Sequence, residues 1–261
     1  MGQSCSTYSS SSTCKPIDNK MNSMIFHPQR INIKDVKEQL RGDDKIILLK
    51  SSNNTNILTY ISKPYSDIKK YIVFAYGNSA SVKGFIPYFK YIQNNLGIGY
   101  VLFDYQGYGC SEGKPSEQNC YDSIDTVMNF LINSLKIDKS DLYLMGNSLG
   151  TGVVINFAYY NDWNTPIILI SPYKTIVKVV FDYSFVRPID KFRTEAKIGK
   201  LNCPVKIIHG EKDNLIPIEH SKHLFSKLNI KDLKPKWIKE ADHSDIFDYI
   251  DILDIHEVLN Y

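Results

Sequence analysis

A serine held between two glycines, in Gly-Asn-Ser-Leu-Gly at residues 146–150, is the part of the sequence that most plainly suggests chemistry. A strand-like apolar run, residues 142–145, precedes it, and a helix-like apolar run, residues 151–157, follows it. Gly-x-Ser-x-Gly in this context is typical of a nucleophile elbow, a strained strand-to-helix turn that projects the serine oxygen above a sheet. The sequence therefore predicts a nucleophile at Ser148, and it predicts that the N–H of Leu149 points to where an oxyanion would form.

A serine hydroxyl needs a base, and the base needs an acid to orient it. With this elbow, the partners follow in the order serine, acid, histidine, each after a later strand. Asp213 falls in a turn after the strand-like start of "IIHGEKDNLIP", and His243 falls in the loop of "WIKEADHSDIF". We expect these two residues to complete a triad with Ser148. Glu211 is the rival acid, while His209 is expected to be a packed structural histidine.

An oxyanion hole needs a second N–H donor, usually from the loop after the third strand. The stretch "FAYGNSAS" supplies that loop, in which Gly77 permits a tight backbone and Asn78 or Ser79 offers the N–H. Asp104 also ends a predicted strand, but it precedes the serine and so breaks the expected order. A role in bracing its own loop is expected for Asp104.

Strand-like and helix-like segments alternate along the chain and would position these residues. The predicted strands are 45–52, 57–63, 70–76, 99–105, 141–145, 166–171, 204–210 and 235–240. The predicted helices are 82–95, 116–136, a segment after 148, 217–228 and a C-terminal helix from 245, with an irregular stretch at 173–200. Such alternation predicts an α/β fold with a mostly parallel sheet and helices on both faces. The hairpin formed by the first two strands predicts that they are antiparallel.

Composition narrows the function classes. The chain has 261 residues and a net charge of only +3 without a long basic run, so nothing indicates nucleic acid as a partner. Five irregularly spaced cysteines form neither a disulfide framework nor a zinc pattern, which favours a reducing, cytoplasmic setting. No apolar run approaches the roughly 20 residues needed to span a bilayer. We expect no metal or organic cofactor.

Taken together, the motifs resemble the α/β-hydrolase superfamily from about residue 44 to the C-terminus. The resemblance is greatest to the branch of membrane-tethered protein depalmitoylases and their fungal and plant relatives. Its carrying stretches are "YGNS" (76–79), "DYQGYGCSEGKPSEQN" (104–119), "GNSLGTG" (146–152), "ISPY" (170–173), "CPVKIIHGEKDNLIP" (203–217) and "ADHSD" (241–245). The resemblance implies that Ser148 is the nucleophile, Asp213 the acid and His243 the base.

Two residues set this chain apart from the pattern of that branch. Tyr76 stands where the family usually has a histidine before Gly-Asn, and Asn147 stands where the depalmitoylases usually carry glutamine. The stretch between "ISPY" and "CPVK" is short, which predicts a small lid.

Residues 1–22 are polar and Ser-rich, and we expect a flexible tail there, followed by a hydrolase domain over residues 23–261. Met-Gly-Gln-Ser-Cys-Ser at the start fits the N-myristoylation pattern, with Gly2 as the acceptor. Cys5 and Cys14 are candidates for palmitate, and one myristoyl chain alone binds membranes only marginally. The depalmitoylases that the chain resembles are themselves tethered through acylated N-terminal cysteines. The predicted place is therefore the cytoplasm, at the cytoplasmic face of membranes.

These residues predict a serine hydrolase of acyl esters or thioesters that acts on an acylated protein or lipid. A lipid esterase or a serine peptidase would use the same constellation equally well. The alternative from another class is a catalytically inactive, membrane-tethered binding module, which the departure at Tyr76 would favour.

Overall fold

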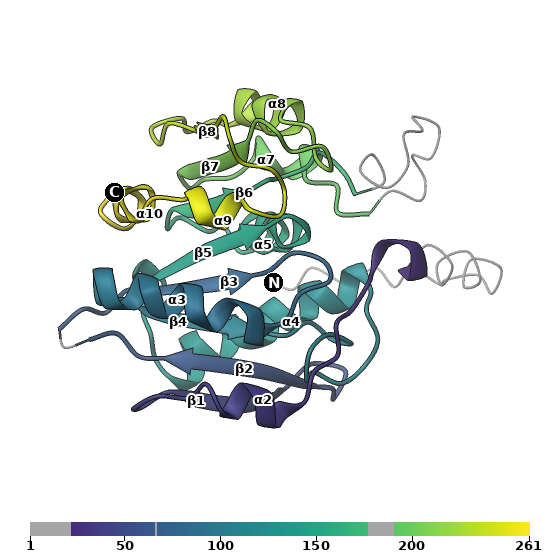
Figure 1. The fold of residues 1–261 in the computed structure, drawn as a ribbon, viewed down its shortest axis with the longest axis vertical. Coiled ribbons are helices and arrows are strands. Elements are labelled where there is room, and N and C mark those ends of the chain that lie inside the picture. The colour runs from purple at the N-terminus through teal and green to yellow at the C-terminus, as the bar shows by residue number, and fades with distance from the viewer. Residues whose placement is uncertain (1–21, 66, 177–190) are drawn as a thin grey trace, which may run out of the picture.

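The computed structural model describes residues 22–65, 67–176 and 191–261. Within them the chain builds one eight-stranded sheet in the order β1-β2-β4-β3-β5-β6-β7-β8 (Figure 1). The strands are β1 Lys45–Lys50, β2 Asn56–Ser62, β3 Tyr71–Ala75, β4 Gly99–Phe103, β5 Leu142–Asn147, β6 Ile167–Ile170, β7 Val205–Gly210 and β8 Lys236–Ile238. β1 pairs antiparallel with β2, and β2 pairs antiparallel with β4. All other pairs are parallel, which confirms the predicted fold class.

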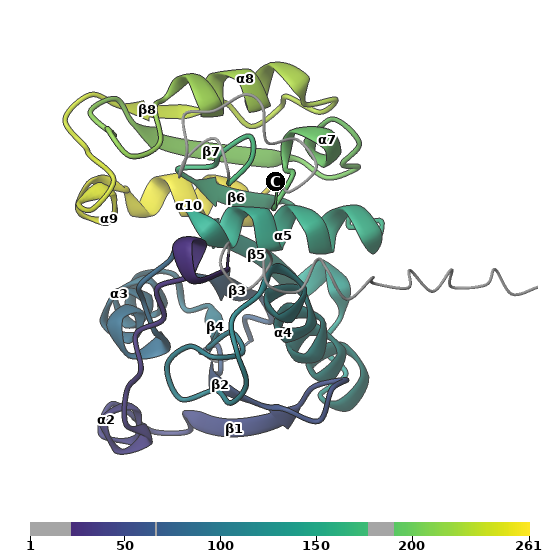
Figure 2. The same cartoon turned by 90° about the vertical axis from the view of Figure 1, so that its right-hand side faces the viewer.

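Helices cover both faces of this sheet. They are α2 Ile33–Lys37, α3 Val82–Leu96, α4 Glu117–Asn129, α5 Leu149–Tyr160, α7 Glu195–Ile198, α8 Glu219–Lys227, α9 Ile246–Tyr249 and α10 Ile252–Leu259. α4 continues into a π-helical turn, Phe130–Ser134, and a 3₁₀ turn, Lys139–Asp141, precedes β5. Figures 1 and 2 show α3, α9 and α10 on one face and α4 and α5 on the other. No helix in the described ranges is both long and apolar enough to cross a bilayer.

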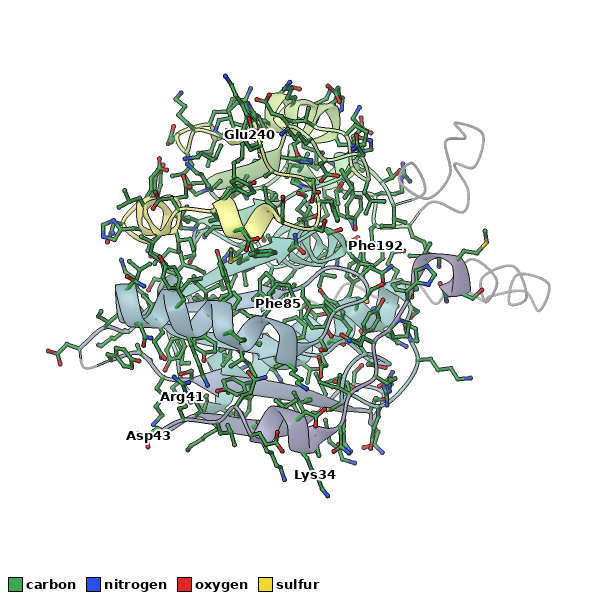
Figure 3. The ribbon with its side chains drawn as sticks, in the orientation of Figure 1. Lys34, Arg41, Asp43, Phe85, Phe192 and Glu240 are labelled. Carbon is green, nitrogen blue, oxygen red and sulfur yellow. The ribbon has the colours of Figure 1, made fainter. Side chains whose placement is uncertain are left out.

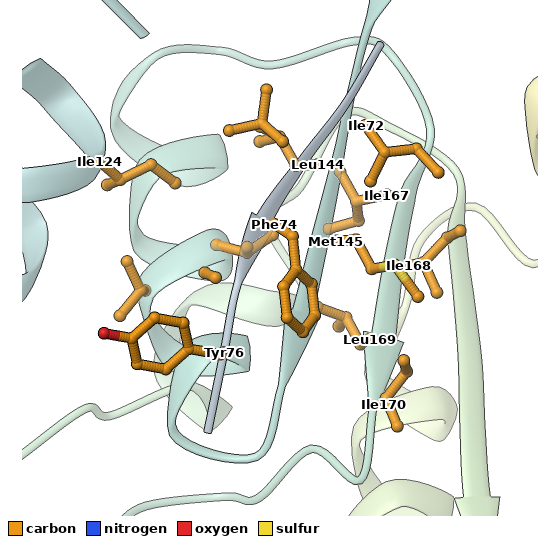
Figure 4. Close-up of a cluster of buried hydrophobic side chains, with 14 of the residues drawn as sticks. Ile72, Phe74, Tyr76, Ile124, Leu144, Met145, Ile167, Ile168, Leu169 and Ile170 are labelled. Carbon is orange, nitrogen blue, oxygen red and sulfur yellow. The ribbon is translucent and has the colours of Figure 1, made fainter. Parts of the chain in front are cut away.

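The core lies between these layers, where the central parallel strands are buried on both faces. Figure 4 shows Ile72, Phe74 and Leu144 beside the four consecutive apolar residues of β6. Buried apolar side chains of this size contribute roughly 1.5–3 kcal/mol each. The charged side chains of Lys34 and Arg41 instead point outward near α2 and β1 (Figure 3). Continuous apolar strands thus become the rigid centre from which the loops of the site extend.

Local signals set the helix ends. The Oγ of Ser116 accepts a hydrogen bond from the N–H of Asn119 and caps the start of α4, at the residue where the predicted helix 116–136 begins. The single predicted C-terminal helix is wrong, because the chain forms α9, breaks at Ile250, and starts again as α10. Asp251 and Asp254 form a capping box at this second start, which makes a new helix more favourable than continuing the first.

Some expectations fall largely outside the described residues. Gly2, Cys5, Cys14 and all of the tail except Asn22 lie there, so the tail and its acylation stay predictions. The stretch between "ISPY" and "CPVK", where a small lid was predicted, is described only in part, because residues 177–190 lie outside the described ranges. The part that is described contains the helix α7.

Candidate active site

Ser148 occupies the sharp turn between β5 and α5. Its backbone has φ +48° and ψ −118°, a conformation that L-residues rarely adopt and that costs about 1–3 kcal/mol. The Ser148 N–H donates to the carbonyl of Ile170 at 2.9 Å, which ties the turn to the end of β6. The strained turn is therefore held by the neighbouring strand.

The two glycines around the serine are explained by close backbone contacts. A Cβ added at Gly150 would lie 1.9 Å from the carbonyl oxygen of Ala75 at the end of β3. A Cβ added at Gly146 would lie 2.7 Å from the carbonyl oxygen of Gly150. Since real Cβ atoms essentially never approach within 3.0 Å, both positions require glycine for this close approach of strand and helix. The Gly-x-Ser-x-Gly spacing thus follows from backbone sterics.

Ser148, His243 and Asp213 come from three different loops and form one chain of hydrogen bonds. The Nε2 of His243 lies 3.1 Å from the Oγ of Ser148, and its Nδ1 lies 2.7 Å from the Oδ2 of Asp213. The His243 side chain is 22% exposed while that of Asp213 is fully buried, so a substrate can reach the histidine but not the acid. This arrangement can move a proton from the serine to an imidazole whose other nitrogen is held by a carboxylate.

Asp213 is held as an anion by its surroundings. The Oδ1 of Asp213 accepts hydrogen bonds from the backbone N–H groups of Leu215 at 3.0 Å and Ile216 at 2.7 Å. Burial alone would raise the pKa of Asp213, but hydrogen bonds from His209 and His243 outweigh it and hold the pKa well below its ordinary value. The surroundings of Asp213 therefore favour its charged form.

The rival acid Glu211, the two acids that flank His243 and the buried His209 take other roles. Glu211 is exposed, and in the described part of the chain no hydrogen bond joins it to His243. Asp242 and Asp245 shape the turn that carries His243. The Oδ1 of Asp242 accepts from the N–H of Asp245 at 3.1 Å, and the Oδ1 of Asp245 accepts from the N–H of Asp242 at 2.7 Å. His209 is fully buried as expected, and it also touches Asp213.

Two backbone N–H groups beside Ser148 are available for an oxyanion. The N–H of Leu149 lies in the first turn of α5, where helices have no internal acceptor. The N–H of Ser79 donates to the Oδ1 of Asn78 at 3.1 Å, whereas the described residues offer no acceptor to the N–H of Asn78. Of the two donors left open by the sequence, the geometry therefore favours Asn78.

Tyr76, which stands where the family usually has a histidine, takes part in the hydrogen bonds that brace the loop after β3. The Tyr76 hydroxyl donates to the Oδ1 of buried Asp104 at 2.9 Å. The same carboxylate accepts from the N–H groups of Val82 and Cys110, both at 2.9 Å. Burial and the neighbouring carboxylate raise the pKa of Tyr76, so its hydroxyl keeps its proton and stays a donor. The expected bracing role of Asp104 is confirmed.

A cavity of about 710 Å³ opens beside Ser148. Its apolar lining consists of Met24, Ile25, Ala80, Phe85, Leu149, Ile176, Leu215, Ile216 and Phe247. The cavity residues Met24, Ile25 and His27 were missed by sequence reasoning. They reach the site because the Asn78 side chain donates to the carbonyl of Ile25 at 2.6 Å and accepts from the N–H of His27 at 3.0 Å. The one available signal was the apolar "MIF" at 24–26, which directly follows the polar tail.

Comparisons with known proteins place this chain among α/β hydrolases. A model of the alpha/beta hydrolase domain family matches residues 68–247, a range that contains Ser148, Asp213 and His243. An α/β hydrolase of Acanthamoeba polyphaga mimivirus is 46% identical over 220 residues, which cover 83% of this chain and 84% of the viral protein. Alpha/beta hydrolase domain-containing protein 17B of Xenopus tropicalis is 28% identical over 200 residues, which cover 76% of this chain and 69% of the frog protein.

Among solved structures, an esterase of Pyrococcus furiosus matches with a TM-score of 0.70 at 18% identity. The match covers 89% of this chain and 98% of the esterase, and at this identity it concerns the fold alone.

Proposed function

Because the chain belongs to the α/β-hydrolase family and is a hydrolase, we propose that it cleaves acyl esters or thioesters with Ser148 as nucleophile, His243 as base and Asp213 as orienting acid. The observation that carries the proposal is the hydrogen-bond chain from Ser148 through His243 to Asp213, with its distances of 3.1 Å and 2.7 Å. The strained backbone of Ser148 also supports its role as nucleophile, since the fold keeps an energetically costly conformation at this residue.

The proposed reaction has two halves. The Oγ of Ser148 attacks the acyl carbonyl while its proton passes to the Nε2 of His243. The oxyanion that forms accepts hydrogen bonds from the N–H groups of Leu149 and Asn78. The C–O or C–S bond then breaks, and the alcohol or thiol leaves with the proton from His243. Water attacks the acyl ester on Ser148, gives one proton to His243, and releases the carboxylic acid as the proton returns to the serine.

The cavity supports an acyl chain as the group that binds beside Ser148. Its lining combines aromatic and aliphatic side chains, among them Phe85, Phe247 and Leu215, and it has the volume of an ordinary small-molecule site. An acylated protein, as for the depalmitoylases that the chain resembles, is the proposed substrate. A lipid ester is the second candidate, because an apolar cavity of this kind would hold either acyl chain.

We also propose that the N-terminus holds the protein at a membrane through acyl groups on Gly2 and Cys5. The described chain starts at Asn22, two residues before Met24 in the cavity lining. A tail anchored at its far end would therefore keep the cavity within reach of acyl groups at the membrane surface.

A substrate panel tests the activity. p-Nitrophenyl esters of increasing chain length and S-acylated peptides are compared for wild type and Ser148→Ala. We expect wild type to hydrolyse these substrates with a preference for longer acyl groups, and we expect Ser148→Ala to lose this activity. Equal activity of the two proteins would contradict it, and cleavage of esters but not thioesters would favour the lipid esterase.

A further inference from the structure

A second histidine, His209, contacts the carboxylate of the proposed triad acid. His209 is the fifth residue of β7 and its side chain is fully buried. Its Nε2 lies 3.2 Å from the Oδ2 of Asp213, the same oxygen that His243 binds, and 2.8 Å from the carbonyl oxygen of Ile216. Among the described residues, His209 and His243 are the titratable side chains in contact with this carboxylate.

The neighbours of His209 fix where its proton lies. The carbonyl oxygen of Ile216 can only accept, so the Nε2 of His209 must carry a hydrogen. The Nδ1 lies 2.5 Å from the Oγ of Ser221 on α8, a hydroxyl that can donate to it. The Nε2–H is then shared between Ile216 and Asp213. The Asp213 carboxylate thus receives two backbone N–H groups on Oδ1 and two imidazole N–H groups on Oδ2.

We infer that His209 is a positioning residue that acts on catalysis through Asp213. The inference rests on the proposed function of Ser148, His243 and Asp213. The Nε2–H of His209 is a second imidazole donor to Oδ2 beside that of His243, and it holds the carboxylate so that Oδ2 stays directed at the base. Because both imidazoles donate to Oδ2, the hydrogen bond from His209 also weakens the hydrogen bond between Asp213 and a protonated His243. Hydrogen bonding by His209, acting against burial, also helps to lower the pKa of Asp213.

Two amide substitutions separate this role from simple packing. His209→Gln places an amide nitrogen near the Nε2 position and keeps a donor for Asp213. His209→Asn places its amide near the Nδ1 position, facing Ser221, and leaves Asp213 without that donor. Both are buried, neutral and polar, so they form a matched pair. Thermal melting and near-UV circular dichroism check that each variant is folded, and kcat/KM for an acyl ester is measured from pH 5 to 9.

Loss of the donor should change both rate and pH dependence. For His209→Asn we expect kcat/KM to fall about tenfold and the acid limb of the pH profile to move up by about 0.5–1 unit, since Oδ2 then binds protonated His243 more strongly. For His209→Gln we expect kcat/KM to fall by no more than about threefold and the acid limb of the pH profile to stay close to that of wild type. Equal losses in the two variants, or an acid limb that stays in place in His209→Asn, would overturn the inference.

A double-mutant cycle checks that the effect passes through the acid. In an Asp213→Asn background, His209→Asn should lower kcat/KM by less than about twofold, because the carboxylate that His209 positions is gone. The same tenfold loss in both backgrounds would show that His209 acts independently of Asp213 and would refute the inference. Failure of the proposed function is distinguishable, because Ser148→Ala would then keep the activity of wild type whatever the His209 variants do.

Discussion

Gly150→Ala tests whether the close approach of α5 and β3 creates the site. The added Cβ would lie 1.9 Å from the carbonyl oxygen of Ala75 and 2.5 Å from its carbonyl carbon. Ordinary contact starts at 3.4 Å, so helix and strand would have to separate by about 1.5 Å. Such overpacking of a dense interior costs roughly 1–3 kcal/mol or more. The shift also moves Ser148 and the N–H of Leu149, and a misplacement of about 1 Å can lower a catalytic rate about 100-fold.

The assay is kcat/KM for a p-nitrophenyl ester together with the melting temperature. Gly84→Ala on α3 is the matched control, because a Cβ there meets no atom within 4 Å. Alanine is also the better helix former by about 1 kcal/mol, so Gly84→Ala should keep its activity and melt at the same or a higher temperature. Wild-type activity and stability in Gly150→Ala would refute the steric account of the elbow.

Three further predictions concern the acid, the oxyanion loop and the anchor. Asp213→Asn should lower kcat/KM by about 10⁴-fold. Because the folded pKa of Asp213 is depressed, its ionised form stabilises the fold fully above the ordinary aspartate pKa of about 3.9, and this stability is lost as the pH falls toward the depressed value. In urea unfolding, the free energy of unfolding of wild type should therefore exceed that of Asp213→Asn by more at pH 7 than at pH 3. A difference that does not change with pH would contradict this. Asn78→Ala removes the side chain that accepts from the N–H of Ser79 and links the oxyanion loop to Ile25 and His27 in the cavity lining. We expect kcat to fall about tenfold, because the loop loses its bracing, and KM to rise, because the lining loses its attachment; unchanged kcat and KM would contradict this. Gly2→Ala should move the protein from the membrane to the supernatant fraction of a cell lysate, and an unchanged membrane fraction would count against the lipid anchor.

The sequence was informative where one local rule fixes the outcome. The elbow at Ser148 is a short-range pattern of strand, glycines and helix, and Asp213 and His243 follow strands whose apolar runs are easily recognised. Parallel strands end at one edge of the sheet, so their loops were expected to meet. The antiparallel first strands were predictable for a different local reason, since the first two strands form a hairpin.

Features that depend on contacts between distant segments were not predictable. Met24, Ile25 and His27 line the cavity, and no local pattern encodes the hydrogen bonds that join Ile25 and His27 to Asn78, more than 50 residues away. The choice of Asn78 over Ser79 as donor depends on a bond from the Ser79 N–H to the Asn78 side chain. His209 was recognised as buried, but its contact with Asp213 depends on the turn after β7 that brings the two side chains together.

Covalent labelling of Ser148 tests the central claim most directly. A fluorophosphonate reacts much faster with a serine that a neighbouring base activates than with an ordinary hydroxyl, and peptide mass spectrometry locates the adduct. The account predicts one adduct on Ser148 in folded wild type, none in Ser148→Ala, and strongly slowed labelling in His243→Ala. Absence of labelling in the folded wild-type protein, or equal labelling of Ser148→Ala, would contradict it.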